Sequence, residues 1–245
     1  MTDAEHIRRA ARDAQPDAVA ARAAFGGSCA LQPVVLLAGD VDRVSELHER
    51  TYAGAVPETM RHDQPAFFAE IAAGGGALLG LEGPGGGLVA YGVLSLPGPH
   101  ASPCCRLLGL APSSPVAQLD GIAVDPAWRG NGLQRRLGQW RMATAARLGH
   151  SHICSTAAPR NVHSWMNLLS LGLVIRGLHV MYGGSLRYVL HCDLEAAAPV
   201  AAVREIAVSD LDRHRELFKV GCAAIGWTGG ARPAGLLFAC PPGRC

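Results

Sequence analysis

The chain has 245 residues, of which 49% are hydrophobic and 17% are charged, and its formal charge at pH 7 is +2. This length and composition predict a globular protein with a sizeable core and exclude a disordered chain. Arginines are scattered and aromatic residues make up only 5% of the chain. Neither the charge nor the stacking surface of a nucleic-acid-binding protein is therefore expected.

No apolar run approaches the ~18 residues that a membrane span requires, so no membrane contact is expected. The first 24 residues mix acidic and basic side chains without an apolar segment, which argues against a signal or transit peptide. Eight cysteines show no CxxC or other metal-ligand spacing, which favours reduced thiols in a cytoplasmic protein over disulfides. They are Cys29, Cys104, Cys105, Cys154, Cys192, Cys222, Cys240 and Cys245.

An Ala- and Arg-rich stretch opens the chain and predicts a polar helical segment over residues 1–30. The main domain is expected over residues 31–193. Its first part predicts, in order, a strand, two helices and a β-hairpin with a glycine-rich turn. These elements are placed at residues 34–38, 40–52, 67–71, 77–81 and 88–96, with the turn at 83–87.

Residues 97–115 contain five prolines and predict a loop at the rim of a functional site. The adjacent Cys104 and Cys105 in this loop suggest either a nucleophile or structural thiols. Structural thiols are favoured, because neither a helix start nor a fixed base is expected nearby to lower the pKa of either sulfur.

A strand, a glycine-rich loop and a helix follow one another over residues 117–148. The strand ends at Asp125-Pro126, since proline has no N–H for a sheet ladder. Gly130 and Gly132 permit tight turns with positive φ, so that backbone N–H groups converge on an anion, and the helix adds the positive end of its dipole. One buried stripe is expected on this helix: Leu133, Leu137, Trp140, Thr144 and Leu148.

Two common phosphate loops do not fit this stretch. A P-loop requires Lys followed by Ser or Thr after its second glycine, whereas Leu133-Gln134 follows Gly132. The dinucleotide fingerprint requires a small residue at the position of Arg135 and an acidic residue about 20 positions further on, where the chain has His150-Ser151-His152. An ordinary strand-to-helix turn remains the alternative to an anion site.

A second strand and helix are predicted at residues 153–156 and 161–173, followed by two strands that are joined at Tyr182. An extension over residues 194–245 contains an Ala/Pro linker and one amphipathic helix that opens at residues 209–212 with a capping-box pattern. We expect its apolar face to pack on the main domain. The alternatives are that this face forms a homodimer interface, or that the extension brings Trp227 to a substrate pocket.

Two of these runs resemble the GNAT superfamily of N-acetyltransferases. Residues 124–132 match its V-x-P-x-x-R-G-x-G run, and residues 129–134 match its pyrophosphate-binding motif, Arg/Gln-x-x-Gly-x-Gly/Ala, except that Gln134 stands at the last position. Residues 161–173 resemble its second motif, with Leu173 in place of Phe. The resemblance implies the α/β fold of that superfamily: a mixed, splayed central sheet with helices on both faces.

The resemblance also implies acetyl-CoA as co-substrate. In the family, the strand before the loop grips the pantetheine and polarises the thioester carbonyl through its backbone, the glycine loop and helix start hold the pyrophosphate, and the second motif contacts the coenzyme. The matching residues here are Ile122, Ala123, Val124, Arg129, Gly130, Asn131, Gly132, Leu133, Gln134, Arg135, Asn161 and Ser164. For Asn161 a helix cap is the alternative, and for Arg135 a solvated helix face.

Members of the family often have an acid or base at the positions that match Gln118 or Asp120, and of these two only Asp120 is ionisable. The resemblance therefore makes Asp120 the candidate for the group that takes or orients the amine proton. By the two-residue period, Gln118, Asp120 and Ile122 are expected to share one strand face. The alternative is an aspartate paired with an arginine or a backbone amide. Leu168 stands where many family members have a tyrosine that acts as the general acid for the leaving sulfur. Tyr182, Ser164 or water is expected to take that role here.

The implied function is transfer of an acetyl or related acyl group to the amine of a small molecule, since no charged trough points to a protein substrate. An acyl-CoA-binding module without activity, favoured by Leu168 and Gln134, and an acyl-CoA decarboxylase on the same fold are the alternatives. His150, His152 and His163 lack a Cys or carboxylate set that would complete a metal site, so no metal is expected.

Overall fold

The computed structural model describes residues 3–23, 28–53, 59–97, 102–111, 113–196 and 202–241. Parts of the predicted N-terminal segment, of the 97–115 loop and of the Ala/Pro linker, together with Cys245, lie outside these residues.

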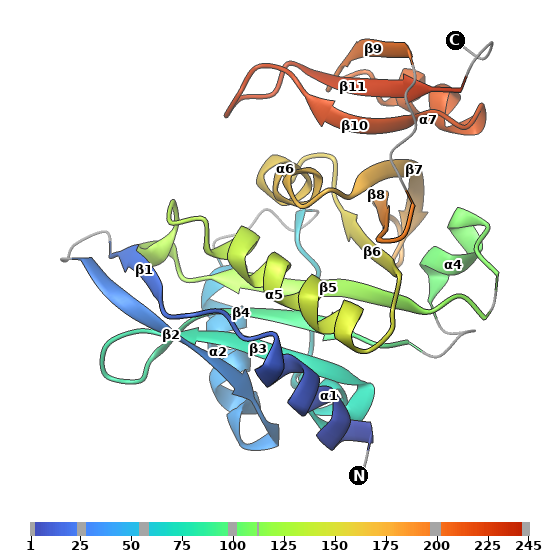
Figure 1. The fold of residues 1–245 in the computed structure, drawn as a ribbon. Helices are drawn as coiled ribbons and strands as arrows, with labels where there is room; N and C mark the ends of the chain where they lie inside the picture. The colour runs from blue at the N-terminus through green and yellow to red at the C-terminus, as the bar shows by residue number, and fades with distance from the viewer. Residues whose placement is uncertain are drawn as a thin grey trace.

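The described residues form an 11-stranded sheet with the order β1-β2-β3-β4-β5-β6-β8-β7-β10-β11-β9 (Figure 1). The strands are β1 (Val19–Arg22), β2 (Ser28–Leu36), β3 (Gly76–Glu82), β4 (Leu88–Ser95), β5 (Val116–Val124), β6 (His152–Ala157), β7 (Val174–Met181), β8 (Ser185–Asp193), β9 (Ala202–Ala207), β10 (Ala223–Trp227) and β11 (Gly235–Cys240). The helices are α1 (Asp3–Asp13), α2 (Val41–Tyr52), α3 (Pro65–Glu70), α4 (Pro103–Leu108), α5 (Leu133–Arg147), α6 (Val162–Ser170) and α7 (Leu211–Lys219).

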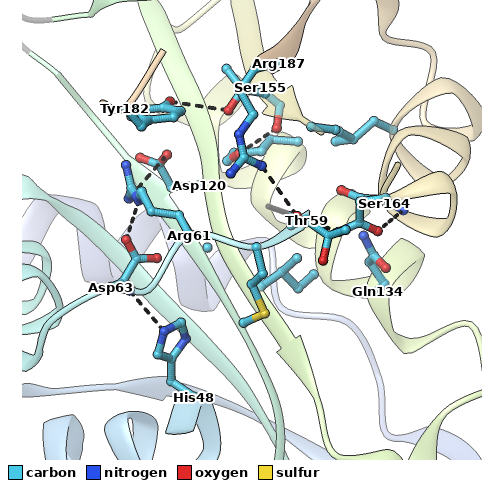
Figure 2. Close-up of a pocket in the computed structure, with 18 of the residues that line it drawn as sticks. His48, Thr59, Arg61, Asp63, Asp120, Gln134, Ser155, Ser164, Tyr182 and Arg187 are labelled. Atoms are coloured by element: carbon cyan, nitrogen blue, oxygen red, sulfur yellow. Dashed lines mark hydrogen bonds and ion pairs between the residues drawn. The ribbon is translucent and has the colours of Figure 1, made fainter. Parts of the chain in front are cut away.

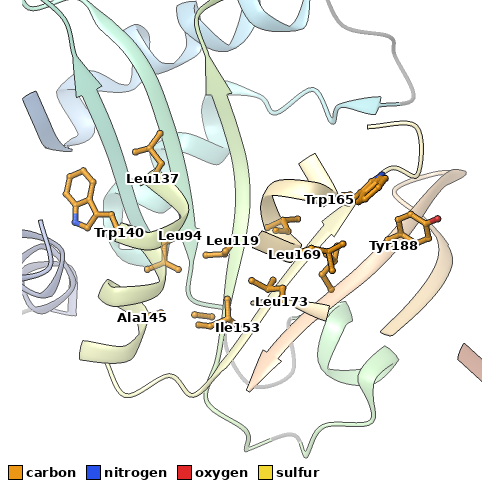
Figure 3. Packing of buried hydrophobic residues seen from close by; sticks show 14 of the residues in the cluster. Leu94, Leu119, Leu137, Trp140, Ala145, Ile153, Trp165, Leu169, Leu173 and Tyr188 are labelled. Carbon is orange, nitrogen blue, oxygen red and sulfur yellow. The ribbon is translucent and has the colours of Figure 1, made fainter. Parts of the chain in front are cut away.

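Two buried clusters lie on opposite faces of the sheet. The larger one joins the sheet to α5 and α6 through residues such as Leu119, Leu137 and Trp165 (Figure 3). The smaller one joins it to α2 and α3 through residues such as Leu47 and Phe68. The predicted α/β class with helices on both faces is confirmed, and so is the buried stripe of α5 at Leu133, Leu137, Trp140 and Thr144.

The sheet splits where β5 leaves β6. These two strands pair in parallel from Val116↔His152 to Leu119↔Ser155, although β5 continues to Val124. The edge of residues 120–124 that faces away from β4 therefore has no strand partner among the described residues. This half of β5 offers its backbone groups to whatever binds beside it.

A β-bulge in β5 lies at this split. Gly92 pairs with Ile122 but Leu94 pairs with Leu119, so β5 has one more residue than β4 between these pairs. The bulge corrects the prediction that Asp120 and Ile122 share one face, because the extra residue reverses the alternation. Accordingly, Ile122 packs in the same cluster as Leu119, whereas Gln118 donates a hydrogen bond to Asp120.

The buried side chain of Arg141, from α5, holds the bulge. The residue is 2% exposed, and its guanidinium donates to the backbone oxygens of Val93 at 3.1 Å, Asp120 at 3.2 Å and Leu137 at 3.3 Å. Gly92 leaves room for it, since a Cβ there would lie 3.0 Å from the Arg141 Nε. Burial lowers the pKa of Arg141 to about 10, so the group stays charged at neutral pH.

Three predicted segments contain more structure than their sequence patterns indicated. The N-terminal segment holds β1 and the start of β2 as well as α1, and the 97–115 loop contains the short helix α4. The extension has three strands besides the predicted helix, which is α7. Helix α7 packs on the main domain as predicted, since its buried His214 Nδ1 lies 3.0 Å from the Tyr188 hydroxyl of β8.

The expectation that all cysteines are reduced is wrong for one pair. Cys222 and Cys240 form a disulfide between the ends of β10 and β11, with their Cα atoms 4.2 Å apart. The register pairs Ala223 with Ala239, so these two cysteines lie opposite each other. The 18-residue separation carries no local signal, because the strand pairing alone brings them together. Cys29, Cys104, Cys105, Cys154 and Cys192 are free thiols.

We predict that Arg141→Met lowers the free energy of unfolding by about 3–5 kcal/mol, because it leaves the Val93 and Asp120 oxygens buried without a donor. Urea unfolding followed by circular dichroism measures the change. Arg147→Met, on the exposed side of the same helix, is the control and is expected to cost no more than about 0.5 kcal/mol. Equal stabilities of the two variants would contradict the role given to Arg141.

A second prediction concerns acid stability. His191 of β8 is 8% exposed and stacks on His152, and burial, followed by the charges of His152 and Arg176, lowers the pKa of His191 to about 4. The unfolded chain, with a histidine pKa of about 6.5, binds this proton first. The free energy of unfolding therefore falls as the pH drops from about 6.5 towards 4.

His191→Gln removes this contribution. Urea unfolding at a series of pH values is expected to show a smaller loss of stability between pH 7 and pH 5 than in the unmodified protein. His6→Gln, at an exposed position of α1, is expected to keep the original slope. If His191→Gln keeps it too, buried His191 is not a source of the acid sensitivity.

Candidate active site

Two adjoining cavities lie beside the unpaired half of β5. The larger, of about 630 Å³, runs along the glycine loop and is called the loop groove. The smaller, of about 100 Å³, lies between β5, β6 and residues 59–63 and is called the inner cavity. Both are lined by Thr59, Met60, Ile122, Gln134, Asn161 and Ser164. The two cavities therefore meet at the middle of β5 and the start of α6.

The glycine loop has the backbone that its sequence predicts. Gly130 has φ 83° and Gly132 has φ 67°, and no atom lies within 4 Å of the position that a Cβ would take at either residue. Gly132 is the N-cap of α5, whose first hydrogen bond runs from the Arg136 N–H to the Gly132 oxygen. The free N–H groups of the first turn of α5 thus lie next to an open glycine surface, an arrangement that suits an anion.

Most residues predicted to bind the cofactor line the loop groove. They are Ile122, Ala123, Val124, Arg129, Gly130, Gly132, Leu133, Gln134, Asn161 and Ser164. Asn131 is not among the residues that line the groove. Its side-chain amide accepts from the Arg22 N–H and donates to the Arg22 oxygen, both at 2.9 Å. Arg135 is exposed outside the lining. Trp128, His163 and Asn167 also line the groove, although the sequence assigned none of them to the cofactor.

The second motif supplies a capped helix and a contact to the first motif. Asn161 Oδ1 accepts from the Ser164 N–H at 3.1 Å, and its Nδ2 donates to the Thr59 oxygen at 3.1 Å. The helix-cap interpretation of Asn161 is thus observed, and its amide also anchors the segment that follows α2. Gln134, which replaces the usual small residue, accepts from Asn167 Nδ2 at 3.1 Å. Its side chain joins α5 to α6.

Asp120 extends from the bulge of β5 into the inner cavity (Figure 2). Its side chain is 12% exposed. One carboxylate oxygen accepts from Ser95 Oγ at 2.5 Å and the other from Gln118 Nε2 at 2.7 Å. The Arg61 guanidinium lies 4.0 Å from it. The carboxylate is therefore held in one orientation by neutral donors, with a cation at the edge of contact.

A hydrogen-bonded chain supports this cation. Arg61 forms an ion pair with the buried Asp63, whose N–H donates to His48 Nε2 at 3.0 Å, and His48 Nδ1 lies 2.7 Å from the Tyr91 hydroxyl. Burial lowers the pKa of His48. Burial also raises the pKa of Asp63, and the positive charge of the nearby Arg61 counteracts this rise. Gly121 leaves room for the Asp63 carboxylate, since a Cβ at residue 121 would lie 2.9 Å from Asp63 Oδ2.

Tyr182 lies in the turn between β7 and β8, as predicted, with φ 51°. Its hydroxyl is 3.3 Å from Thr156 Oγ1, and the guanidinium groups of Arg61 and Arg187 lie 5.2 Å and 5.8 Å from its ring centre. It lines the inner cavity, as does the buried Leu168. Burial raises the pKa of Tyr182, so its hydroxyl keeps its proton at neutral pH.

Sequence reasoning missed the residues that enter from outside the two motifs. Arg61 and Asp63 belong to a short segment without a recognisable pattern, and Arg187 is one arginine in an otherwise ordinary strand. Only the fold brings them to β5. Within the described ranges, no group of three His, Cys, Asp or Glu residues is arranged to hold a metal ion, and no helix has the length and apolar character needed to cross a membrane.

Comparison with known proteins agrees with this geometry. Residues 41–172 match the model of the acetyltransferase (GNAT) family, which is more than half of the chain. A search of curated proteins gives no match.

Solved structures share the fold at low identity. The yncA structure from Salmonella typhimurium, with its cofactor acetyl-CoA, has a TM-score of 0.51 and 19% identity over 70% of this chain and 99% of its own. A phosphinothricin acetyltransferase from Sinorhizobium meliloti, in complex with acetyl-CoA, has a TM-score of 0.52 and 16% identity over 69% and 93%. An aminoglycoside acetyltransferase in complex with coenzyme A and kanamycin has a TM-score of 0.51 and 13% identity over 66% and 94%. The motifs, the split sheet and the family match together establish that this chain belongs to the GNAT acetyltransferase family.

Proposed function

We propose that the protein transfers an acetyl group from acetyl-CoA to the amine of a small molecule. The observation that carries this proposal is the junction of the two cavities at β5, where Ile122 and Ser164 line both. A thioester at the end of the loop groove would meet an amine in the inner cavity at this junction. Asp120 lies on the amine side of it.

The loop groove suits coenzyme A. The positive-φ glycines leave an open surface that any Cβ would fill, and the start of α5 adds backbone donors for a pyrophosphate. Residues 122–124 of β5, whose outer edge pairs with no strand in the described part of the chain, would hydrogen-bond the pantetheine. A backbone N–H from the same edge would stabilise the charge that develops on the thioester oxygen.

Asp120 would take the ammonium proton of the acceptor, directly or through one water. Ser95 and Gln118 hold both of its oxygens, so the carboxylate presents a fixed acceptor to the amine. The acetyl carbon would then be attacked by the neutral amine, with departure of the coenzyme A sulfur.

Release of the sulfur does not require the tyrosine that Leu168 replaces. A thiol with a pKa of ~8.5 leaves as the thiolate at neutral pH without a strong acid. Tyr182, in the inner cavity, and Ser164, at the junction, are the hydroxyl groups that would return a proton to it.

Two other functions are separated by one assay. Leu168 and the Gln134–Asn167 contact favour a silent acyl-CoA-binding module, and a decarboxylase would use the same groove. Free thiol and carbon dioxide are measured from acyl-CoA with and without a panel of amines. Amine-dependent thiol release supports transfer, carbon dioxide supports decarboxylation, and binding with neither product supports the module.

We predict that Asp120→Asn lowers kcat at pH 7 by about 100-fold or more, because the amine proton loses its acceptor. Asp212→Asn, at a largely exposed position of α7, is the matched control. Full turnover in Asp120→Asn at pH 7 would remove the proposed role.

A further prediction tests the loop groove with two glycines that have the same backbone. Gly130 and Gly85, in the β3–β4 turn, both have φ 83° and open space where a Cβ would lie. Alanine at either position is expected to cost about 1–2 kcal/mol of stability through backbone strain. Only Gly130→Ala is expected to raise the Kd for acetyl-CoA, by tenfold or more, in isothermal titration calorimetry. Equal Kd values for both variants and the unmodified protein would exclude the loop as the pyrophosphate site.

A further inference from the structure

The inner cavity holds an uneven set of charges. It is lined by the acidic Asp63 and Asp120 and by the basic Arg61, Arg141 and Arg187. Arg61 is neutralised by its ion pair with Asp63 and by the nearby Asp120. The Arg141 guanidinium is satisfied by three backbone oxygens beneath the bulge. These interactions leave the positive charge of Arg187 unbalanced.

Arg187 is buried without an ionic partner in the part of the chain that the structure describes. The residue is 5% exposed, and its Nε has no hydrogen-bond partner there. One amino group reaches the Thr59 oxygen at 3.4 Å, and the Tyr182 ring lies 5.8 Å away. Burial lowers the pKa of Arg187. A buried guanidinium with one long hydrogen bond to a neutral oxygen is costly, and an anion that enters the cavity would complete its hydrogen bonds.

The position of Arg187 limits the shape of an anion that could bind it. Arg187 enters the cavity from β8, whereas Asp120 enters from the bulge of β5 (Figure 2). An acceptor that presents its ammonium to Asp120 would thus place its other end in reach of β8. The cavity volume of about 100 Å³ is small beside the 300–1,000 Å³ of typical ligand pockets, which favours a short molecule.

We propose that the acceptor is a short amine that carries a carboxylate, an amino acid in the general sense, and that Arg187 pairs with this carboxylate. The inference rests on the proposed function, since it names the class of amine that the inner cavity takes. The planar guanidinium can bind both carboxylate oxygens at once, which an amide or an alcohol at the same place cannot reproduce.

The test compares each acid with its own amide. Thiol release from acetyl-CoA is measured with glycine, alanine, β-alanine and serine and with the corresponding primary amides, which keep the amine and the size but lose the charge. The expected kcat/KM is at least 100-fold higher for the best acid than for its amide. An equal kcat/KM for acid and amide would overturn the proposal while leaving acetyl transfer intact.

Arg187→Gln assigns the preference to this side chain. In this variant the ratio of kcat/KM between acid and amide is expected to fall from 100-fold or more to near one. A ratio that is unchanged while both rates fall would show a structural role alone and would overturn the proposal. Arg215→Gln, in α7 and paired with Asp212, is the control and is expected to keep the full ratio.

Binding keeps the inference testable even without turnover. Isothermal titration calorimetry of N-acetylalanine and N-acetylalaninamide, in the presence of coenzyme A, measures the carboxylate contact alone. Tighter binding of the acid that Arg187→Gln abolishes supports the carboxylate site even if no amine is acetylated, in which case only the proposed function fails. Equal or undetectable binding of both probes would overturn the carboxylate site.

Discussion

The site depends on the separation of β5 from β6, and the buried guanidinium of Arg141 lies where these two strands separate. The last parallel pair is Leu119↔Ser155, the next residue is Asp120, and it is the Asp120 oxygen that Arg141 binds together with the Val93 oxygen of β4. A charged donor beneath the strand stabilises two carbonyl groups that the bulge takes out of the regular ladder. The helix that follows the glycine loop thereby also fixes the strand that precedes it.

This arrangement explains why one strand lines two cavities. Beyond the bulge, residues 122–124 line the loop groove, and at the bulge Asp120 faces the inner cavity. Because the bulge reverses the alternation, Ile122 packs with Leu119 while Asp120 joins the polar side chains of Ser95 and Gln118. The proposed donor and acceptor sites are thus set by the backbone of a single strand, and the surrounding elements supply charge.

The features that the sequence predicted are those encoded locally. Positive φ at Gly130 and Gly132, the buried stripe of α5 and the helix after Asn161 each depend on a few consecutive residues. The features that it missed depend on pairing across the fold. The bulge arises from the register with β4, the Cys222–Cys240 disulfide from the pairing of β10 with β11, and the Arg61–Asp63 pair from a segment that Asn161 anchors through Thr59. The periodicity of a sequence does not predict such contacts.

The central claim is that the loop groove and the inner cavity are the donor and acceptor halves of one active site that meet at β5. The most direct test is a crystal structure of the protein with coenzyme A and an N-acetylated amino acid. The account predicts the pyrophosphate against Gly130 and Gly132, the pantetheine along residues 122–124, and the acetylated nitrogen beside Asp120 in the inner cavity. Coenzyme A bound elsewhere, or an acetyl group that lies outside the junction of the two cavities, would contradict it.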